Sequence, residues 1–423
     1  MTQTATTRWA FFIKRLSRRL WLRATAIGAL GIVAAVLAAV VERFVPFEMP
    51  GSINADSVDS ILTIIASSML AVTTFSLSAM TSAYASATSN VTPRATTLLI
   101  EDRLTQNVLS TFLGSFLYGM VGIVVLKTGA YGDRGRVILF LITIGVIALI
   151  VFQLLRWIDH LTKLGRVSET TGRIEEAAAN AIEARRQNPY LGGRSLDQVD
   201  TDVLHQATDI TAGVIGYIQH IDIKALSLLA ERVDRDIYLA VNPGAFVYED
   251  SPVASWLAPA ADTKDNNDPA AALRAAITVG TERSFEQDPR FGLVVMSETA
   301  QRALSPAVND PGTAIDVIGR STRLLSRWAE PAKTSKPAFP RIFVPPLRSD
   351  DLFEDAFMTI ARDGAAQVEV QLRLQKCLAS LSRMGSGDFR AAARCQAALA
   401  LSRAEKALPI DADLQRLRKD LED

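Results

Sequence analysis

The sequence predicts an α-helical multi-pass membrane protein with four transmembrane helices and a mostly helical α+β cytoplasmic domain. Two observations lead to this fold class. Four long stretches before residue 156 contain no ionisable side chain, and charged residues become dense only after that point, as expected for a chain that meets two solvents. We therefore divide the chain into a transmembrane domain (1–158), a helical connector (159–200), a small β-rich subdomain (201–257) and a mainly helical cytoplasmic domain (258–423).

The uncharged stretches have lengths that suit membrane-spanning helices. A helix needs roughly 20 residues to cross a hydrocarbon core of about 30 Å. The second stretch, residues 60–93, exceeds this length, so we expect a Ser- and Thr-rich extension beyond its membrane part. The first stretch could instead be a secretory signal, because a basic segment precedes it, but its long apolar core and the three spans that follow favour a retained anchor. We place the spans at about residues 22–41, 61–82, 105–126 and 137–155.

The charges that flank the spans predict their orientation. Residues 1–23 carry six basic and no acidic side chains, whereas residues 42–59 carry one arginine and four acidic residues. Basic residues return after the fourth span, at Arg156, Lys163 and Arg166. Because positively charged flanks stay in the cytoplasm, we expect both termini there.

The spans also differ in the side chains that they offer for packing. In the third span, Ser110 with Gly114 and Ser115 with Gly119 are spaced four residues apart, which lets helix backbones approach closely. The first span has small residues at the same spacing. The fourth span is rich in large aliphatic residues and is expected to face lipid.

The second span carries hydroxyl side chains at spacings of three, four and seven residues, which places them on one face of a helix. One interpretation is hydrogen bonding and close packing between helices. The other is a polar lining for the path of an ion or solute. The absence of Asp, Glu, Lys and His from the spans makes a proton-coupled transporter less attractive. The candidate lining residues are Thr63, Ser67, Thr74, Ser78 and Thr81.

A second candidate site is the dense polar region of residues 281–316 in the soluble half. Much of it has a structural explanation, because Asp288 and Asp310 each precede a proline and suit the N-cap of a helix. The alternative is a functional site that binds a ligand or a partner domain. Its candidate residues are Glu282, Arg283, Asp288, Arg302, Ser305, Asn309 and Asp310.

Hydrophobic periodicity and turn residues predict the remaining elements of the soluble half. We expect a β-branched strand run, a short helix and two or three further short strands before a flexible loop at residues 258–269, and mainly helices after it. The predicted elements are strands at 210–221, 237–241 and 251–256, a helix at 223–233, helices at 270–283, 291–304 and 311–328, an extended segment at 341–344, and helices after 350 with a break at 384–388.

Several sequence motifs resemble one bacterial family. They are Gly-Tyr-Ile-Gln at residues 216–219, Pro-Gly-x-Phe-Val at 243–247, Gln-Asp-Pro-x-Phe-Gly at 287–292 and Ala-Leu-Ser-Pro-Ala-Val-Asn-Asp-Pro at 303–311. With the preceding order of four spans, this pattern is similar to the predicted bacterial membrane proteins known as domain of unknown function 2254. The likeness covers nearly the whole chain, with mild departures at Ala245 and Asp250. It implies the bacterial inner (plasma) membrane and brings no activity with it.

Composition and motifs narrow the possible functions. Lys+Arg and Asp+Glu both number 45, so no basic field suggests nucleic acid, and no P-loop, nucleophile elbow, zinc motif or dinucleotide-binding pattern suggests an enzyme or a cofactor. The expected partners are the lipid bilayer and further copies of the chain, and the ligand is unknown. We favour an oligomeric pore or transport-like protein with a cytoplasmic regulatory domain. The alternative is a non-transporting membrane scaffold or sensor that binds a partner or ligand through its cytoplasmic domain, and a weaker third hypothesis is a membrane-tethered enzyme that uses Glu282, Asp288 and Asp310.

Overall fold

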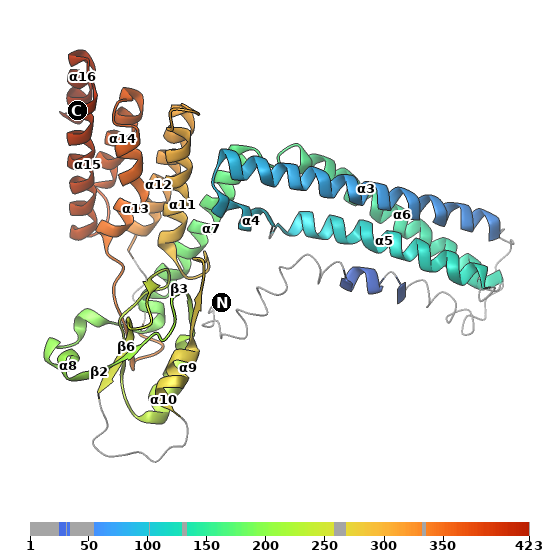
Figure 1. Cartoon of the computed structure of the whole chain (residues 1–423), viewed down its shortest axis with the longest axis horizontal. Coiled ribbons are helices and arrows are strands. Elements are labelled where there is room, and N and C mark those ends of the chain that lie inside the picture. The colour runs from blue at the N-terminus through green and yellow to red at the C-terminus, as the bar shows by residue number, and fades with distance from the viewer. Residues whose placement is uncertain are drawn as a thin grey trace. The chain divides into compact units, whose positions relative to one another are not determined.

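The computed structural model describes residues 25–30, 32–33, 55–100, 102–128, 133–257, 268–331 and 336–422 (Figure 1). The described residues form two compact units. The membrane unit contains the described residues up to Ser89 together with Ala95–Thr170, and the C-terminal unit contains Asn90–Arg94 and the residues from Thr171 onward.

Among the described residues of the membrane unit, three helices are long and apolar enough to cross a bilayer. They correspond to the second, third and fourth predicted spans. The first predicted span lies mostly outside the described residues, of which 25–30 and 32–33 are helical. The three helices are α3 (Ala55–Asn90), α5 (Arg103–Lys127) and α6 (Asp133–Leu161), and a 3-10 turn (Pro93–Ala95) and α4 (Thr96–Ile100) join α3 to α5.

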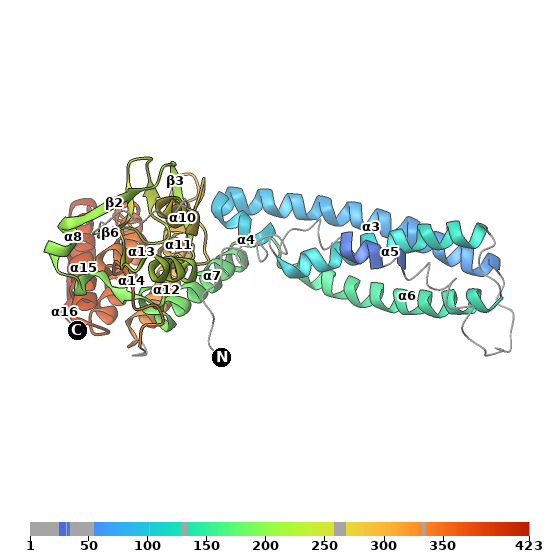
Figure 2. The same cartoon turned by 90° about the horizontal axis from the view of Figure 1, so that it is seen from below.

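The three helices lie side by side (Figure 2) and differ in how far their side chains are buried. In α5, 56% of the most apolar segment is buried, against 17% in α6. A Cβ atom at Gly114 would lie 2.8 Å from the Ile27 side chain, and one at Gly119 would lie 3.1 Å from the Leu62 carbonyl oxygen, so these glycines permit close helix contact. One side of α6 buries Leu139, Ile150 and Trp157, and many of its other large side chains, such as Phe152, are exposed, as expected of a helix that faces lipid.

The described residues of the C-terminal unit form two β-sheets. The larger has the strand order β1-β8-β4-β6-β2, in which β8 runs parallel to both β1 and β4 and the other pairs are antiparallel. The smaller is antiparallel, with the order β5-β3-β7. The strands are β1 (Arg194–Ser195), β2 (Ala207–Thr211), β3 (Gly216–Ile221), β4 (Ile237–Leu239), β5 (Phe246–Val247), β6 (Pro252–Leu257), β7 (Ile277–Gly280) and β8 (Ile342–Val344).

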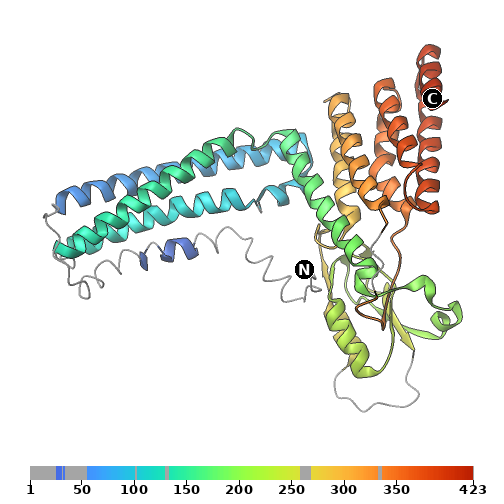
Figure 3. The same ribbon diagram turned by 180° about the vertical axis from the view of Figure 1, so that it is seen from behind.

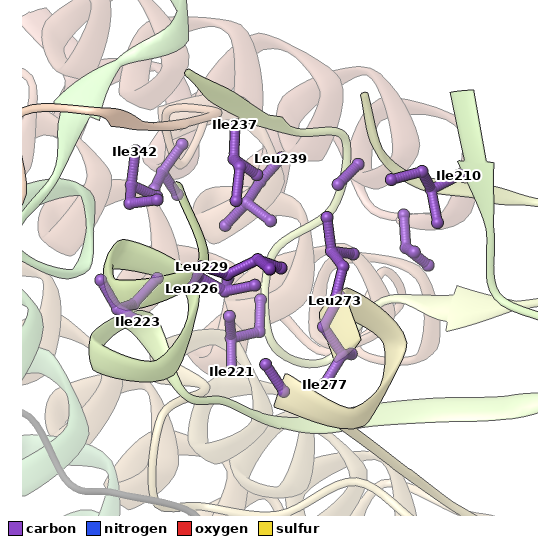
Figure 4. Close-up of a cluster of buried hydrophobic side chains, with 14 of the residues drawn as sticks. Ile210, Ile221, Ile223, Leu226, Leu229, Ile237, Leu239, Leu273, Ile277 and Ile342 are labelled. Carbon is purple, nitrogen blue, oxygen red and sulfur yellow. The ribbon is translucent and has the colours of Figure 1, made fainter. Parts of the chain in front are cut away.

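Two amphipathic helices, α9 (Ile223–Val233) and α10 (Pro269–Ala276), share a hydrophobic core with these strands (Figure 4). Leu226 and Leu229 of α9 and Leu273 of α10 meet the aliphatic side chains of the sheets. This core holds β3 and β4 in place, and these strands carry the loops of the candidate site described below.

The last six helices of the C-terminal unit, α11 to α16, pack mainly against one another (Figures 1 and 3). The α11–α12 pair packs on α13 and α14, and α15 contacts both α13 and α14. These six helices are α11 (Pro289–Ala303), α12 (Pro311–Ala329), α13 (Ser349–Asp363), α14 (Val368–Leu381), α15 (Gly387–Ala407) and α16 (Asp411–Glu422). Earlier in the chain lie α7 (Val167–Gln187) and α8 (Thr201–Gln206), with 3-10 turns at Pro189–Gly192 and Leu196–Gln198, and α8 contacts β6.

Two sequence predictions differ from the observed elements. The predicted helix over 270–283 ends at Ala276, because the β-branched residues that follow form β7 and pair with β3. The predicted strand over 210–221 is two strands, β2 and β3, in different sheets, since Gly213 adopts a φ of +67° and turns the chain. Residues 258–267 of the predicted loop lie outside the described residues.

Candidate functional site

The five candidate lining residues all lie on the exposed face of α3. At 3.6 residues per turn they fall within an arc of roughly 60°. We call this set, Thr63, Ser67, Thr74, Ser78 and Thr81, the hydroxyl face. Residues on the opposite side of α3, such as Leu62 and Met69, are buried against the other helices of the membrane unit.

The hydrogen bonds of the hydroxyl face run within α3. Ser67 Oγ donates to the Thr63 carbonyl at 2.8 Å, Thr74 Oγ1 to the Leu70 carbonyl at 2.6 Å and Thr81 Oγ1 to the Ser78 carbonyl at 2.9 Å. Since a carbonyl oxygen only accepts, each of these hydroxyl protons points at the helix and the oxygen lone pairs remain available. Within the described residues, these three hydroxyls thus donate to carbonyls of their own helix, and no other helix receives their protons.

A polar cluster that sequence analysis missed joins the start of α5 to the end of α6. Asp102 caps α5 by accepting from the Thr105 N–H at 2.9 Å, and His160 Nε2 lies 3.0 Å from both Asp102 Oδ2 and Thr105 Oγ1. His160 and Thr105 are buried. The only sequence signal was the N-cap pattern at Asp102, because the partner histidine is 58 positions away, as the numbering shows.

In the C-terminal unit, Asp288 is the centre of one half of the predicted polar site. It is 1% exposed and caps α11 by accepting from the N–H groups of Arg290 and Phe291 at 3.1 and 3.2 Å. Arg283 Nη2 lies 2.7 Å from its second carboxylate oxygen. Burial raises the pKa of Asp288, and the Arg283 guanidinium and the backbone N–H donors act against that rise.

The turn at Gly244 covers this carboxylate. Gly244 has a φ of +92°, and its N–H donates to the Ile218 carbonyl at 2.8 Å. A Cβ atom at this position would lie 2.1 Å from Asp288 Oδ2. The Pro-Gly and Asp-Pro motifs are therefore two sides of one tight contact, which leaves no room for a ligand between them.

Arg185 of α7 is a second buried arginine near Asp288. Sequence analysis missed it because no local sequence pattern indicates that its side chain is buried. Its Nη2 donates to Asn242 Oδ1 at 2.6 Å, and Asn242 Nδ2 donates to the Pro345 carbonyl at 3.0 Å. Burial lowers the pKa of Arg185 to about 10, and the charge of Asp288 acts in the opposite direction. Asp288 thus balances the charge of two arginines from different elements.

The loop between β7 and α11 is held on β3 by side-chain amides. Gln287 accepts from the Ile221 N–H at 2.9 Å and donates to its carbonyl at 3.3 Å, and Gln219 Nε2 donates to the Glu282 carbonyl at 2.7 Å. Glu282 takes part in this docking through its backbone. These bonds give the Gln-Asp-Pro segment a structural role.

The other half of the predicted site lies at the opposite end of α11. Asp310 caps α12 by accepting from Thr313 N–H at 3.0 Å and Thr313 Oγ1 at 2.6 Å, and these bonds lower its pKa. Ser305 Oγ donates to the Arg302 carbonyl at 2.7 Å, and Asn309 adopts a φ of +50°. The turn from Pro306 to Asp310 is exposed.

The residues of the predicted polar region therefore lie at two separate places, one at each end of α11. The 15 residues of α11 separate its caps, a distance of about 22 Å at 1.5 Å per residue. Asp288 and Asp310 are each occupied as helix caps, and Asp288 is also ion-paired. This arrangement argues against an enzyme site made from Glu282, Asp288 and Asp310. Among the described residues no cluster of three His, Cys, Asp or Glu side chains is placed to hold a metal ion.

Comparison with known proteins gives one family and no solved structure. Uncharacterised proteins of Mycobacterium bovis and Mycobacterium tuberculosis are 27% identical to the chain over 240 residues, which is 55% of this chain and 45% of each relative. The chain thus matches less than half the length of these curated relatives. No solved structure matches. The family of predicted membrane proteins called domain of unknown function 2254 matches residues 17–380, and the chain belongs to this family.

Proposed function

We propose that this protein forms an oligomeric pore or transport-like assembly in the bacterial inner membrane, with the hydroxyl face of α3 lining the path. The observation that carries the proposal is the exposure of all five hydroxyl side chains on one face of a transmembrane helix. The hydroxyl face points away from the other described helices of its own copy, so one copy alone cannot enclose a path along it. Several copies arranged around a symmetry axis would do so.

The chemistry of the hydroxyl face favours cations or neutral solutes over anions. The protons of Ser67, Thr74 and Thr81 are engaged by backbone carbonyls, so these side chains present acceptor lone pairs to the path. Acceptors replace water around a cation, as oxygen-lined filters do. Anions would need donors, which these three hydroxyls do not offer.

The proposed orientation places both termini in the cytoplasm. The Asp102–His160 contact brings the start of α5 and the end of α6 to the same side of the membrane unit. The basic residues Arg156 and Lys163 lie at this end, whereas Asp56 and Asp59 lie at the start of α3. The C-terminal unit follows α6 and would act as a cytoplasmic regulatory domain.

The test is ion and solute flux through liposomes that contain the purified full-length protein. We expect flux above that of empty vesicles, and at least a tenfold loss in the variants Thr74→Leu and Ser78→Leu, because leucine removes the acceptor and narrows the path. The controls Thr74→Ser and Ser78→Thr keep a hydroxyl and should retain most of the flux. Flux equal to that of empty vesicles, or leucine variants that conduct normally, would overturn the proposal.

A second candidate function is a non-transporting scaffold or sensor that binds a partner through the C-terminal unit. The exposed turn between α11 and α12 favours it, since Val308 is 52% exposed beside the polar Asn309 and Asp310. Crosslinking in native membranes would identify a partner. If this candidate is correct, crosslinking to the partner is lost in the double variant Asn309→Ala/Asp310→Ala. The variant Asp310→Asn keeps a side chain that can cap α12, and it should remain folded.

A further inference from the structure

The segment that follows α3 belongs to the C-terminal unit. Residues Asn90–Arg94 are grouped with the C-terminal unit, although they continue α3 and lead into α4 and α5 of the membrane unit. Val91 and Thr92 are 1% and 3% exposed. The helix that carries the hydroxyl face is therefore continuous with a buried segment that belongs to the C-terminal unit.

Glu298 of α11 holds this segment with both carboxylate oxygens. Thr92 Oγ1 donates to Glu298 Oε2 at 3.1 Å, and Arg94 Nη1 forms an ion pair with Glu298 Oε1. Charge-assisted bonds of this kind are stronger than neutral ones. The Arg94 side chain is 56% exposed, so solvent screens the pair and it can open reversibly.

Glu298 projects from a helix that is fixed within the C-terminal unit. Six residues before it, a Cβ atom at Gly292 would lie 2.2 Å from the Cβ atom of Ala178, so α11 and α7 are in close contact. Next to Glu298, Ser297 Oγ forms a hydrogen bond with Thr359 Oγ1 of α13. A shift of α11 within this unit would therefore move the carboxylate that holds Thr92 and Arg94.

We propose that Glu298, with Thr92 and Arg94, is a regulatory clasp that couples the C-terminal unit to α3. The clasp rests on the proposed function, because it regulates the path that the hydroxyl face lines. A change in the packing of α11 opens or tightens the clasp, and the segment after α3 transmits the change along a rigid helix. Glu298 is thus a positioning residue, and it does not contact the transported solute.

One test measures the clasp itself by limited trypsin digestion of the full-length protein in liposomes. Because the Arg94 side chain is paired and Ala95 is buried, we expect slow cleavage of the Arg94–Ala95 bond in the parent protein. In Glu298→Gln we expect cleavage after Arg94 to be at least fivefold faster, as measured by mass spectrometry of the fragment that ends at Arg94. The control Glu354→Gln, which removes an exposed carboxylate from α13 of the same unit, should match the parent protein.

A second test measures flux in the same vesicles. Glu298→Arg places two cations together, and we expect its flux to differ at least threefold from that of the parent. The double variant Arg94→Glu/Glu298→Arg restores the pair with reversed charges and should return the flux to within twofold, while Glu354→Arg should leave it unchanged. The clasp proposal is wrong, and the proposed function stands, if the parent protein shows flux that Glu298→Arg does not change. The same holds if cleavage after Arg94 is unchanged in Glu298→Gln. The absence of flux from the parent protein overturns the proposed function and the regulatory role together.

Discussion

The α-carbon of Gly244 faces the carboxylate of Asp288 so closely that an added Cβ atom would lie 2.1 Å from Oδ2. The carboxylate has little freedom to move away, because it caps α11 and is paired with Arg283. The φ of +92° at Gly244 is a second constraint, since L-residues with side chains are strained there. The contact joins the turn before β5 to the start of α11.

We predict that Gly244→Ala destabilises the C-terminal unit by about 2–4 kcal/mol, the sum of a steric clash and backbone strain. Thermal and urea unfolding of the full-length protein in detergent, followed by tryptophan fluorescence, would measure the change. Gly319→Ala in α12 is the matched control, because its Cβ atom would meet nothing within 4 Å. It should be neutral or stabilising by up to about 1 kcal/mol, as expected for alanine in a helix. Equal stabilities of the two variants would contradict the steric account.

We predict that removal of the Asp288 side chain lowers the free energy of unfolding more than neutralisation of its charge does. Asp288→Ala removes the cap of α11 and leaves Arg283 and the buried Arg185 without their shared counter-charge, so we expect a loss of about 3–5 kcal/mol. Asp288→Asn keeps an oxygen that can cap the helix and should lose less. Unfolding by urea in the same detergent would separate the two variants. An equal loss in both would mean that the cap contributes nothing.

The contact between Gly292 of α11 and Ala178 of α7 predicts a compensating pair of substitutions. Gly292→Ala places a methyl group 2.2 Å from the Ala178 Cβ atom, and we expect a loss of about 1–3 kcal/mol from overpacking. Ala178→Gly creates the space for that methyl group. The double variant should therefore recover part of the loss, with a coupling energy of at least about 0.5 kcal/mol in a double-mutant cycle. Strictly additive losses would show that the helices relax apart.

The sequence was informative where the physical signal is local. The Asp-Pro pairs predicted the starts of α11 and α12, because an N-cap and a proline at the first helical position act within one turn. The strand β7 was missed because Ile277–Gly280 directly follows an Ala-rich helix and becomes a strand through its pairing with β3. Short elements of this kind depend on partners that are far away in the chain.

The candidate sites show the same division between local and tertiary information. Helical spacing predicted that Thr63, Ser67 and Thr74 share one face, but the exposure of that face depends on which side of α3 the other helices cover. Likewise, the burial of Arg185 and the pairing of Asp102 with His160 arise from contacts between elements that are distant in sequence. No periodicity in the sequence reports such contacts.

The carboxylate of Glu175 predicts how stability depends on pH. Partial burial raises its pKa, but hydrogen bonds and charge attraction from Arg323 and Arg320 outweigh this effect and hold the pKa below its usual value of 4.5. A depressed pKa in the folded state means that the ion pairs stabilise the protein above pH 4.5 and that this contribution is lost as the pH falls through the folded pKa.

Glu175→Gln should therefore reduce the free energy of unfolding at pH 7 by about 1 kcal/mol and have a smaller effect as the pH falls below 4.5 and through the folded pKa. Glu369→Gln removes an exposed carboxylate from α14 and serves as the control. The measurement is the urea midpoint of each full-length variant between pH 3 and pH 7. Because Glu175 joins α7 to α12, a pH-independent difference between Glu175→Gln and the parent would show that the glutamate acts through packing or hydrogen bonding and that its charge contributes little.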